Sequence, residues 1–119
     1  MKVRSRGQAE AFRTLDGSTI RVLLDDQFGG ASEQSLAEAT VAAGARTWRH
    51  YHARTEEIYV VLDGSGRMAV DGDEHAVGPG DAILIPPCAW HEIWADRSGE
   101  LRFLCCCAPP YSDQDTFFE

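Results

Sequence analysis

Short apolar segments alternate with turn sequences along most of this 119-residue chain. Gly, Asp and Pro recur at intervals of roughly eight to twelve residues, and the segments between them are rich in β-branched and aromatic side chains. No segment has the length or the period of a helix that could connect two parallel strands. We therefore predict an all-β fold, either a sandwich or a barrel.

The expected strands follow the apolar runs and end at the turns. They are predicted at residues 20–24, 35–41, 46–52, 57–62, 67–70, 74–77, 82–85, 91–95 and 101–108. Residues 35–41 fit a strand or a short helix by pattern alone, and we take a strand. The pairs Pro86-Pro87 and Pro109-Pro110 end two strands, because proline has no backbone N–H to donate.

Length and composition fit one domain with a core of its own. No stretch approaches the roughly 20 apolar residues of a membrane span, and no apolar run follows the basic first residues as it would in a signal peptide. We expect a cytoplasmic protein without a membrane partner, and a single domain over residues 1–119. N-terminal strands are expected within 1–34, the barrel core over 35–108, and a tail over 109–119 whose Phe117 and Phe118 cover apolar surface.

The net charge of −8 argues against a nucleic-acid partner, which would require a basic face. Cys88 stands alone, whereas Cys105, Cys106 and Cys107 are consecutive in a predicted strand, where neighbours point to opposite faces and cannot readily bridge each other. Arg102 should face outward, which turns Cys105 and Cys107 inward. We interpret the cysteines as small buried hydrophobic residues; a redox-sensitive group beside a metal is the alternative for Cys105 or Cys107.

Three histidines and one glutamate have the spacing of a metal site. His50 and His52 share one face of a predicted strand, about 6.6 Å apart along it. Glu57 follows a short loop, and His91 opens a later strand. Three imidazoles and a carboxylate suit one divalent transition metal ion such as Mn, Fe, Ni or Zn better than Ca or Mg. We predict His50, His52, Glu57 and His91 as its ligands, with about two octahedral positions left open.

Two nearby residues compete for a place in this set. Glu56 and Glu57 cannot both face inward once the strand has begun. We prefer Glu57, because the residues from there to Gly64 have the pattern of a core strand, and we interpret Glu56 as a solvated charge. His75 lies near a hairpin turn among charged neighbours, and we expect it to be exposed and without a role.

The spacing of these residues resembles the first motif of the cupin superfamily, G-x5-H-x-H-x(3,4)-E-x6-G. All of its fixed positions are matched, by Gly44, His50, His52, Glu57 and Gly64. The resemblance covers about residues 35–108. It implies a single-domain double-stranded β-helix, also called a jelly-roll or cupin barrel, of the small bacterial kind, with a bound metal and a homodimeric assembly.

The second cupin motif, G-x5-P-x-G-x2-H-x3-N, is matched more loosely. Gly72 lies one residue too early for Pro79. The segment from Pro79 through Pro86-Pro87 to His91 has the shape usual in small cupins. Ala95 stands where the motif has Asn, and because that Asn is generally not a ligand its loss changes little.

Strand alternation indicates which other side chains face the pocket. Arg46 and Trp48 share the predicted face of His50, and Tyr59 shares that of Glu57. We take Tyr59 and Arg46 as candidate catalytic residues in a mostly apolar pocket. The alternatives are a packed strand aromatic for Tyr59 and a solvated charge at the barrel mouth for Arg46.

Membership of the cupins leaves the reaction open, because one fold serves many chemistries. Cupins with this ligand set include dioxygenases, isomerases, lyases and cyclases. The resemblance therefore implies a metal-dependent enzyme acting on a small-molecule substrate. The alternative is a non-catalytic module that binds or senses a sugar or an acid.

Overall fold

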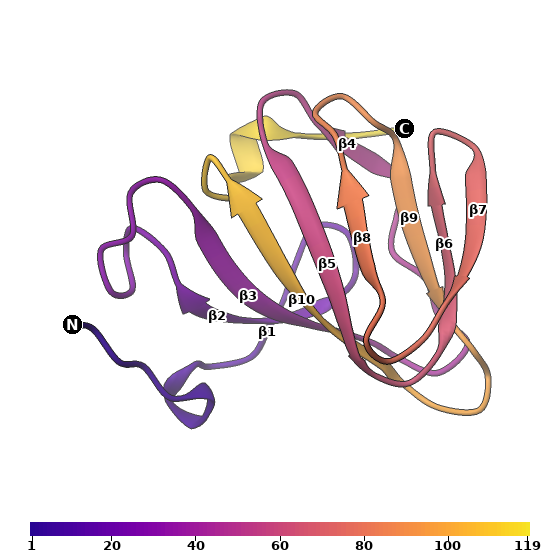
Figure 1. Ribbon diagram of the computed structural model, residues 1–119, viewed down its shortest axis with the longest axis horizontal. Coiled ribbons are helices and arrows are strands. Elements are labelled where there is room, and N and C mark those ends of the chain that lie inside the picture. The colour runs from indigo at the N-terminus through magenta and orange to yellow at the C-terminus, as the bar shows by residue number, and fades with distance from the viewer.

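The computed structural model describes all 119 residues and consists almost entirely of β-strands, as predicted (Figure 1). One antiparallel sheet has the order β1-β2-β3-β10-β5-β8, and the other has the order β11-β4-β9-β6-β7. The strands are β1 (Phe12–Arg13), β2 (Thr19–Leu24), β3 (Ser35–Val41), β4 (His50–His52), β5 (Glu56–Asp63), β6 (Gly66–Val70), β7 (Asp73–Val77), β8 (Ala82–Ile85), β9 (His91–Ala95), β10 (Leu101–Ala108) and β11 (Thr116–Phe118).

Most predicted strands are confirmed to within one residue at each end, including the strand at residues 35–41. The strand predicted at 46–52 is too long, because only its last three residues are regular. N-terminal strands were expected within residues 1–34, but the bounds of β1 were not predicted and β11 was missed, since each is short and weakly patterned. Two single 3-10 turns, η1 (Arg6–Gln8) and η2 (Asp113–Asp115), are the only helices, and neither could cross a membrane.

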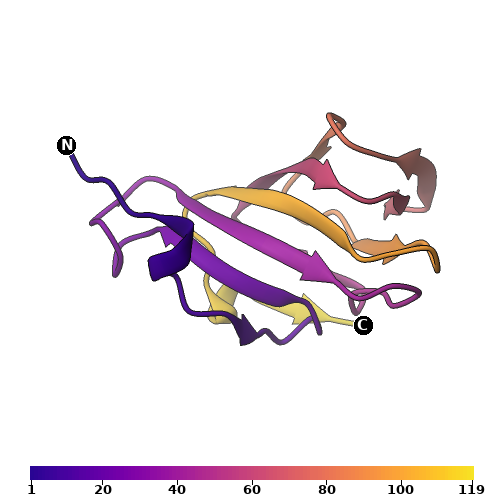
Figure 2. The ribbon, with the colours of Figure 1, turned by 90° about the horizontal axis from the view of Figure 1, so that it is seen from below.

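The two sheets face each other over a buried apolar core (Figure 2). Strand alternation supplies it: on β10, Phe103, Cys105 and Cys107 are buried, whereas Arg102 lies on the outer face as expected. Side chains such as Ile85 and Ile93 are almost completely buried. Each such burial stabilises the fold by roughly 1.5–3 kcal/mol, and the core therefore holds the strands that carry the site.

The glycine that ends the first cupin motif is required by the β5–β6 hairpin. Gly64 has a φ of +83°, and a Cβ there would collide with the carbonyl oxygen of Glu100. Gly66 is equally constrained, because its Cβ would collide with the carbonyl oxygen of Trp94. The close approach of these backbones fixes the register of β5 and with it the position of Glu57.

Segments near both ends of the chain form sheet edges: β1 is one edge of the six-stranded sheet, and β11 is one edge of the five-stranded sheet. Strand β11 pairs with β4, so that Thr116 lies opposite His52 and Phe118 opposite His50. The tail thus extends a sheet at its edge. Phe117 covers Tyr51, with ring centroids 5.1 Å apart, but about two fifths of its own surface stays exposed.

Candidate metal centre

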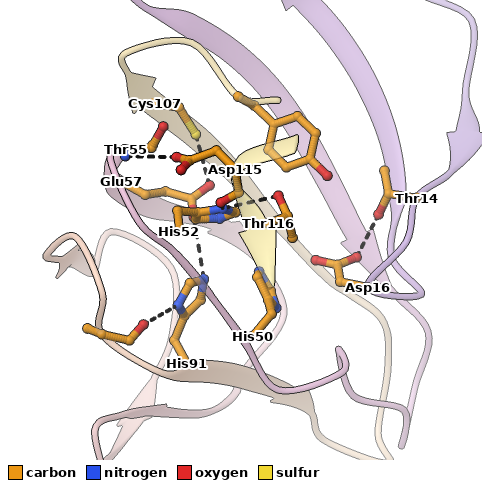
Figure 3. Close-up of polar contacts among 12 residues, drawn as sticks. Thr14, Asp16, His50, His52, Thr55, Glu57, His91, Cys107, Asp115 and Thr116 are labelled. Carbon is orange, nitrogen blue, oxygen red and sulfur yellow. Dashed lines mark hydrogen bonds and ion pairs between the residues drawn. The ribbon is translucent and has the colours of Figure 1, made fainter. Parts of the chain in front are cut away.

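The four predicted ligands meet between the two sheets (Figure 3). His50 and His52 come from β4 and His91 from the start of the neighbouring strand β9, where it pairs directly with His50. Glu57 reaches them from β5 in the opposite sheet. All four side chains are buried. The i, i+2 spacing on β4 therefore places both imidazoles on the inner face, as expected from the sequence.

The ligand atoms are close enough to share one ion. One ring nitrogen of each of His50, His52 and His91 lies within 4.8 Å of the others. Oε1 of Glu57 lies 3.3 Å from Nε2 of His52 and 3.5 Å from Nε2 of His91. Glu56 is exposed, whereas Glu57 is 4% exposed, and the choice of Glu57 as the inward carboxylate is confirmed.

Backbone carbonyls fix the orientation of the three rings. Nδ1 of His50 lies 2.7 Å from the carbonyl of Trp48, and Nδ1 of His91 lies 2.9 Å from that of Ala89. Nδ1 of His52 faces the carbonyl of Asp115 at 3.3 Å. A carbonyl can only accept, so each Nδ1 carries the proton and each Nε2 of the neutral ring presents a lone pair.

Two buried polar atoms at the centre have no hydrogen-bond partner, Oε1 of Glu57 and Nε2 of His91. Buried polar atoms are nearly always paired, because an unpaired one costs about 1–3 kcal/mol. Here lone pairs of imidazole nitrogens and a carboxylate face one another, an arrangement that a cation would satisfy. The residues present therefore fit a bound divalent metal ion.

The pKa values of His50, His52 and Glu57 reflect the same crowding. Burial and the neighbouring His91 lower the pKa of His50 to about 4. Burial opposes ionisation of His52 and Glu57, but attraction outweighs it: the carboxylate favours a proton on His52, and the imidazoles of His52 and His91 favour the ionised carboxylate. The pKa of His52 is therefore raised, and that of Glu57 is lowered to about 2. Glu57 is accordingly a carboxylate at neutral pH, the state in which it can bind a metal.

Two of the consecutive cysteines lie beside the centre. The Cys107 thiol donates a hydrogen bond to Oε2 of Glu57 over 3.1 Å. Burial, followed by the charge of Glu57, raises the pKa of Cys105 and of Cys107 far above the ordinary value. Both are therefore protonated thiols, and a thiol is far less reactive than a thiolate. Cys88 is exposed and Cys106 half-buried.

A cavity lies next to the histidines, and its volume open to water-sized molecules is about 90 Å³. This is several times the space that one water needs. Tyr59 lines it as expected, with its ring against Phe103 at 4.6 Å and no hydrogen bond to its hydroxyl from the chain. Burial raises the Tyr59 pKa well above its ordinary value, so the hydroxyl stays protonated.

Arg46 and Trp48, which were expected to face the pocket, lie outside it. The Arg46 guanidinium is 3.7 Å from the Glu92 carboxylate and more than half exposed, and Trp48 is 61% exposed. The expectation is wrong because alternation does not extend back from β4. In a regular strand, Thr47 and His50 would face opposite sides, because three positions separate them, yet both are buried. The backbone between them is irregular, and the residues before His50 therefore face the sides opposite to those predicted.

Several residues around the centre were missed. The N-terminal segment supplies part of the cavity wall through Phe12, Asp16 and Ile20, and the tail supplies Asp115 and Thr116 beside His52. A polar stretch such as residues 1–18 carries no periodic signal that would place it there. His75 is exposed, as predicted, and its Nδ1 lies 2.6 Å from the carbonyl oxygen of Ala76.

The second motif is better matched than the prediction allowed. Counted from Gly80, the spacing G-x5-P-x-G-x2-H places Pro86 and His91 at its fixed positions and Cys88 at its second glycine. Cys88 has a φ of +68°, a conformation that favours glycine. The chain therefore keeps the backbone conformation of the motif at this position, although cysteine replaces the glycine. Counting back from His91, rather than forward from Gly72, would have found this alignment.

Residues 37–107 match the family model of the cupin domain. The match spans more than half of the chain, which therefore belongs to the cupin family. An uncharacterized protein of Methanocaldococcus jannaschii is 46% identical over 103 residues, which cover 87% of this chain and 82% of that protein.

Two solved structures show the same fold. The polyketide cyclase RemF of Streptomyces resistomycificus has a TM-score of 0.79 at 27% identity, covering 97% of this chain and 89% of that one. The nucleoside dehydratase Pac13 of Streptomyces has a TM-score of 0.80 at 18% identity, covering 100% and 91%. The predicted jelly-roll barrel of the cupins is thereby confirmed, and its structural neighbours include enzymes that act on small molecules.

Proposed function

We propose that this cupin is a metal-dependent enzyme that binds one divalent transition metal ion through His50, His52, Glu57 and His91. The strongest support is the convergence of imidazole nitrogens, each freed for binding by a carbonyl on Nδ1, upon the unpaired Oε1 of Glu57. The adjoining cavity gives a small organic molecule access to the same point. Mn, Fe, Ni and Zn all suit this ligand set.

When bound, such an ion supplies Lewis acidity toward an oxygen of the substrate. The residues of the chain then have separate tasks. Apolar side chains such as Phe103 and Ile20 bind the body of the substrate and exclude water. The protonated hydroxyl of Tyr59 lines the cavity without a partner in the chain, and we propose it as the donor of a hydrogen bond or a proton to the substrate.

We favour a cyclase, isomerase or lyase over a dioxygenase. RemF, a polyketide cyclase, is similar to this chain over almost its whole length and is 27% identical. Apolar and polar side chains line the cavity in almost equal number, which suits a small, oxygen-bearing organic substrate. The alternative is a protein that binds a small molecule without converting it. A turnover assay distinguishes the enzyme from this binding module.

Metal content tests the proposed centre directly. His52→Ala removes one ligand, and elemental analysis should show that the variant loses the metal that the wild-type protein retains. His75→Ala is the matched control, because His75 is an exposed histidine of the same barrel. Equal metal content in the His52→Ala and wild-type proteins would contradict the assignment.

Turnover tests the class of reaction. The metal-loaded protein should be offered small aromatic and polyketide-like substrates under air and under nitrogen, with products followed by mass spectrometry. We expect products of unchanged mass, or of mass lowered by one water, formed equally well without oxygen. Oxygen uptake coupled to substrate loss would instead identify a dioxygenase, and binding without any product would favour the binding module.

We also propose a homodimer formed through the outer face of the six-stranded sheet. A row of apolar side chains crosses four neighbouring strands there, Leu36, Cys106, Ile58 and Leu84 in order. Leu84 is 57% exposed and Ile58 38%, and contiguous exposed apolar surface of this kind favours association. Light scattering should report a dimer that Leu84→Glu converts to a monomer; a wild-type monomer would contradict the proposal.

A further inference from the structure

The turn between β1 and β2 brings an aspartate, Asp16, into the wall of the cavity that holds the candidate metal centre. Thr14, Asp16 and Ser18 line this cavity together with His50 and Glu57. In the view of Figure 3, His50 lies between Glu57 and Asp16. The cavity therefore has a second polar side, formed by a segment that is distant in sequence from all four candidate ligands.

Three hydrogen bonds fix one oxygen of this carboxylate. Oδ1 of Asp16 accepts from the Thr14 hydroxyl at 2.6 Å, from the Ser18 hydroxyl at 2.6 Å and from the Ser18 backbone N–H at 2.9 Å. Ser18 is itself almost completely buried. Oδ2 makes no hydrogen bond within the chain, and Figure 3 shows it turned toward the histidines. Asp16 is thus a rigid acceptor with one free oxygen in the cavity wall.

Backbone hydrogen bonds also tie this turn to the strand that carries the histidines. The Trp48 N–H donates to the carbonyl of Asp16 over 2.8 Å, and the carbonyl of Trp48 accepts from Nδ1 of His50 over 2.7 Å. The negative charge of Asp16 reaches the cavity interior. Burial raises the pKa of Tyr59, and the charges of Glu57 and Asp16 add to that effect.

We propose that Oδ2 of Asp16 accepts a hydrogen bond from a hydroxyl group at the end of the substrate opposite to its metal-binding oxygens. The substrate class is then a small, mostly apolar molecule with oxygen ligands at one end and a hydroxyl at the other. This inference rests on the proposed metal centre. A carboxylate at the far end is disfavoured, because it would bring a second negative charge against Oδ2.

Hydroxamates of increasing chain length test this directly, because their two oxygens bind a metal while the other end can be varied. The protein is loaded with Co(II), and its visible spectrum reports binding of ligands that end in a hydroxyl, a methyl or a carboxylate. At the best chain length we expect the hydroxyl-ended ligand to bind about tenfold tighter than the methyl-ended one. The carboxylate-ended ligand should bind most weakly.

Asp16→Asn gives the second arm. Its Oδ1 can still accept from Thr14 and Ser18, but an amide N–H₂ replaces Oδ2. The carboxylate-ended ligand should then gain about tenfold relative to the methyl-ended one, while Co(II) content, melting temperature and affinity for the methyl-ended ligand stay unchanged. Asp26→Asn, an exposed aspartate just beyond β2, is the matched control and should keep the wild-type ranking.

The outcomes separate this inference from the proposed function. Equal affinities for hydroxyl and methyl ends in the Co(II)-loaded wild-type protein, or an unchanged ranking in Asp16→Asn, would overturn the role of Asp16 and leave the metal centre standing. Failure of the wild-type protein to take up Co(II) would overturn the metal centre itself, and the inference with it.

Discussion

Cys107 on β10 and Glu57 on β5 lie directly opposite each other in the sheet, and the thiol donates a hydrogen bond to Oε2 of the carboxylate over 3.1 Å. Because Oε2 is engaged, Oε1 is the oxygen that faces His52 and His91. Burial keeps the thiol protonated and hence a donor. Cys107 is therefore a positioning residue that orients Glu57 for the proposed metal ion.

Removing this donor should weaken metal binding without abolishing it. Cys107→Ala leaves Oε2 unpaired in a buried place, and we expect an affinity for Zn(II) about tenfold lower, as is typical for partners of metal ligands. Cys107→Ser keeps an O–H donor and should retain most of the affinity. Competition against a chromophoric chelator measures both values.

Cys106→Ala is the matched control for Cys107→Ala, because Cys106 is the adjacent residue and points to the opposite face of β10. It should leave the Zn(II) affinity unchanged. If Cys107→Ala bound Zn(II) as tightly as Cys106→Ala, the positioning role of Cys107 would be wrong.

Metal removal should destabilise the protein, because lone pairs and a carboxylate then face one another without a cation. A ligand present at one hundred times its dissociation constant raises the free energy of unfolding by about 2.7 kcal/mol. Differential scanning fluorimetry of the chelated protein should therefore show a higher melting temperature on adding Zn(II) or Mn(II). The same addition should not stabilise His91→Ala, and equal shifts in the two proteins would argue that the ion binds elsewhere.

The sequence was informative where regular alternation holds. On β10 and β5 each residue faces the side that parity predicts, which is why Glu57 could be chosen over Glu56 and Cys107 placed inward. The same rule failed for Arg46, because the backbone between Thr47 and His50 is irregular and a single change of phase turns Arg46 outward and Thr47 inward.

The remaining parts of the site depend on contacts between distant segments, which no local pattern reveals. Asp16 reaches the cavity because its turn pairs with Trp48, and Asp115 reaches His52 because the tail pairs with β4. Both aspartates lie in short polar stretches. The composition of these stretches predicts a loop. It does not distinguish a loop exposed to solvent from one that packs against a site.

The C-terminal tail should contribute both to stability and to the proposed centre. The Asp115 carboxylate accepts hydrogen bonds from the backbone N–H groups of Arg54 and Thr55, in the loop between two strands that carry ligands, and its carbonyl faces His52. Asp115→Ala should lower the free energy of unfolding by about 1 kcal/mol and the Zn(II) affinity about tenfold. Denaturant unfolding and chelator competition measure the two.

Gln114→Ala is the matched control for Asp115→Ala, since Gln114 is exposed in the same 3-10 turn and its side chain makes no hydrogen bond. It should change neither the free energy of unfolding nor the Zn(II) affinity. A loss of affinity as large in Gln114→Ala would show that the tail is generally fragile and that Asp115 has no particular role.

The N-terminal segment is held to the barrel by an ion pair with a buried carboxylate. Glu38 on β3 is 4% exposed, and both of its oxygens lie 2.9 Å from Nε of Arg6. Arg102 on β10 also contacts this carboxylate, with its guanidinium 3.5 Å from Oε2 of Glu38. The hydrogen bond from Arg6 lowers the pKa of Glu38 despite the opposing effect of burial.

Acid should therefore weaken this attachment. Because the Glu38 pKa in the folded protein lies below its ordinary value of 4.5, the carboxylate stabilises the fold above that value, and the contribution is lost as the pH falls through the folded pKa. The melting temperature of the wild-type protein should fall more steeply from about pH 6 to about pH 3 than that of Glu38→Gln, which has no proton to gain. Glu33→Gln, at an exposed position just before β3, should follow the wild-type curve. Parallel curves for Glu38→Gln and the wild-type protein would mean that other carboxylates control acid unfolding.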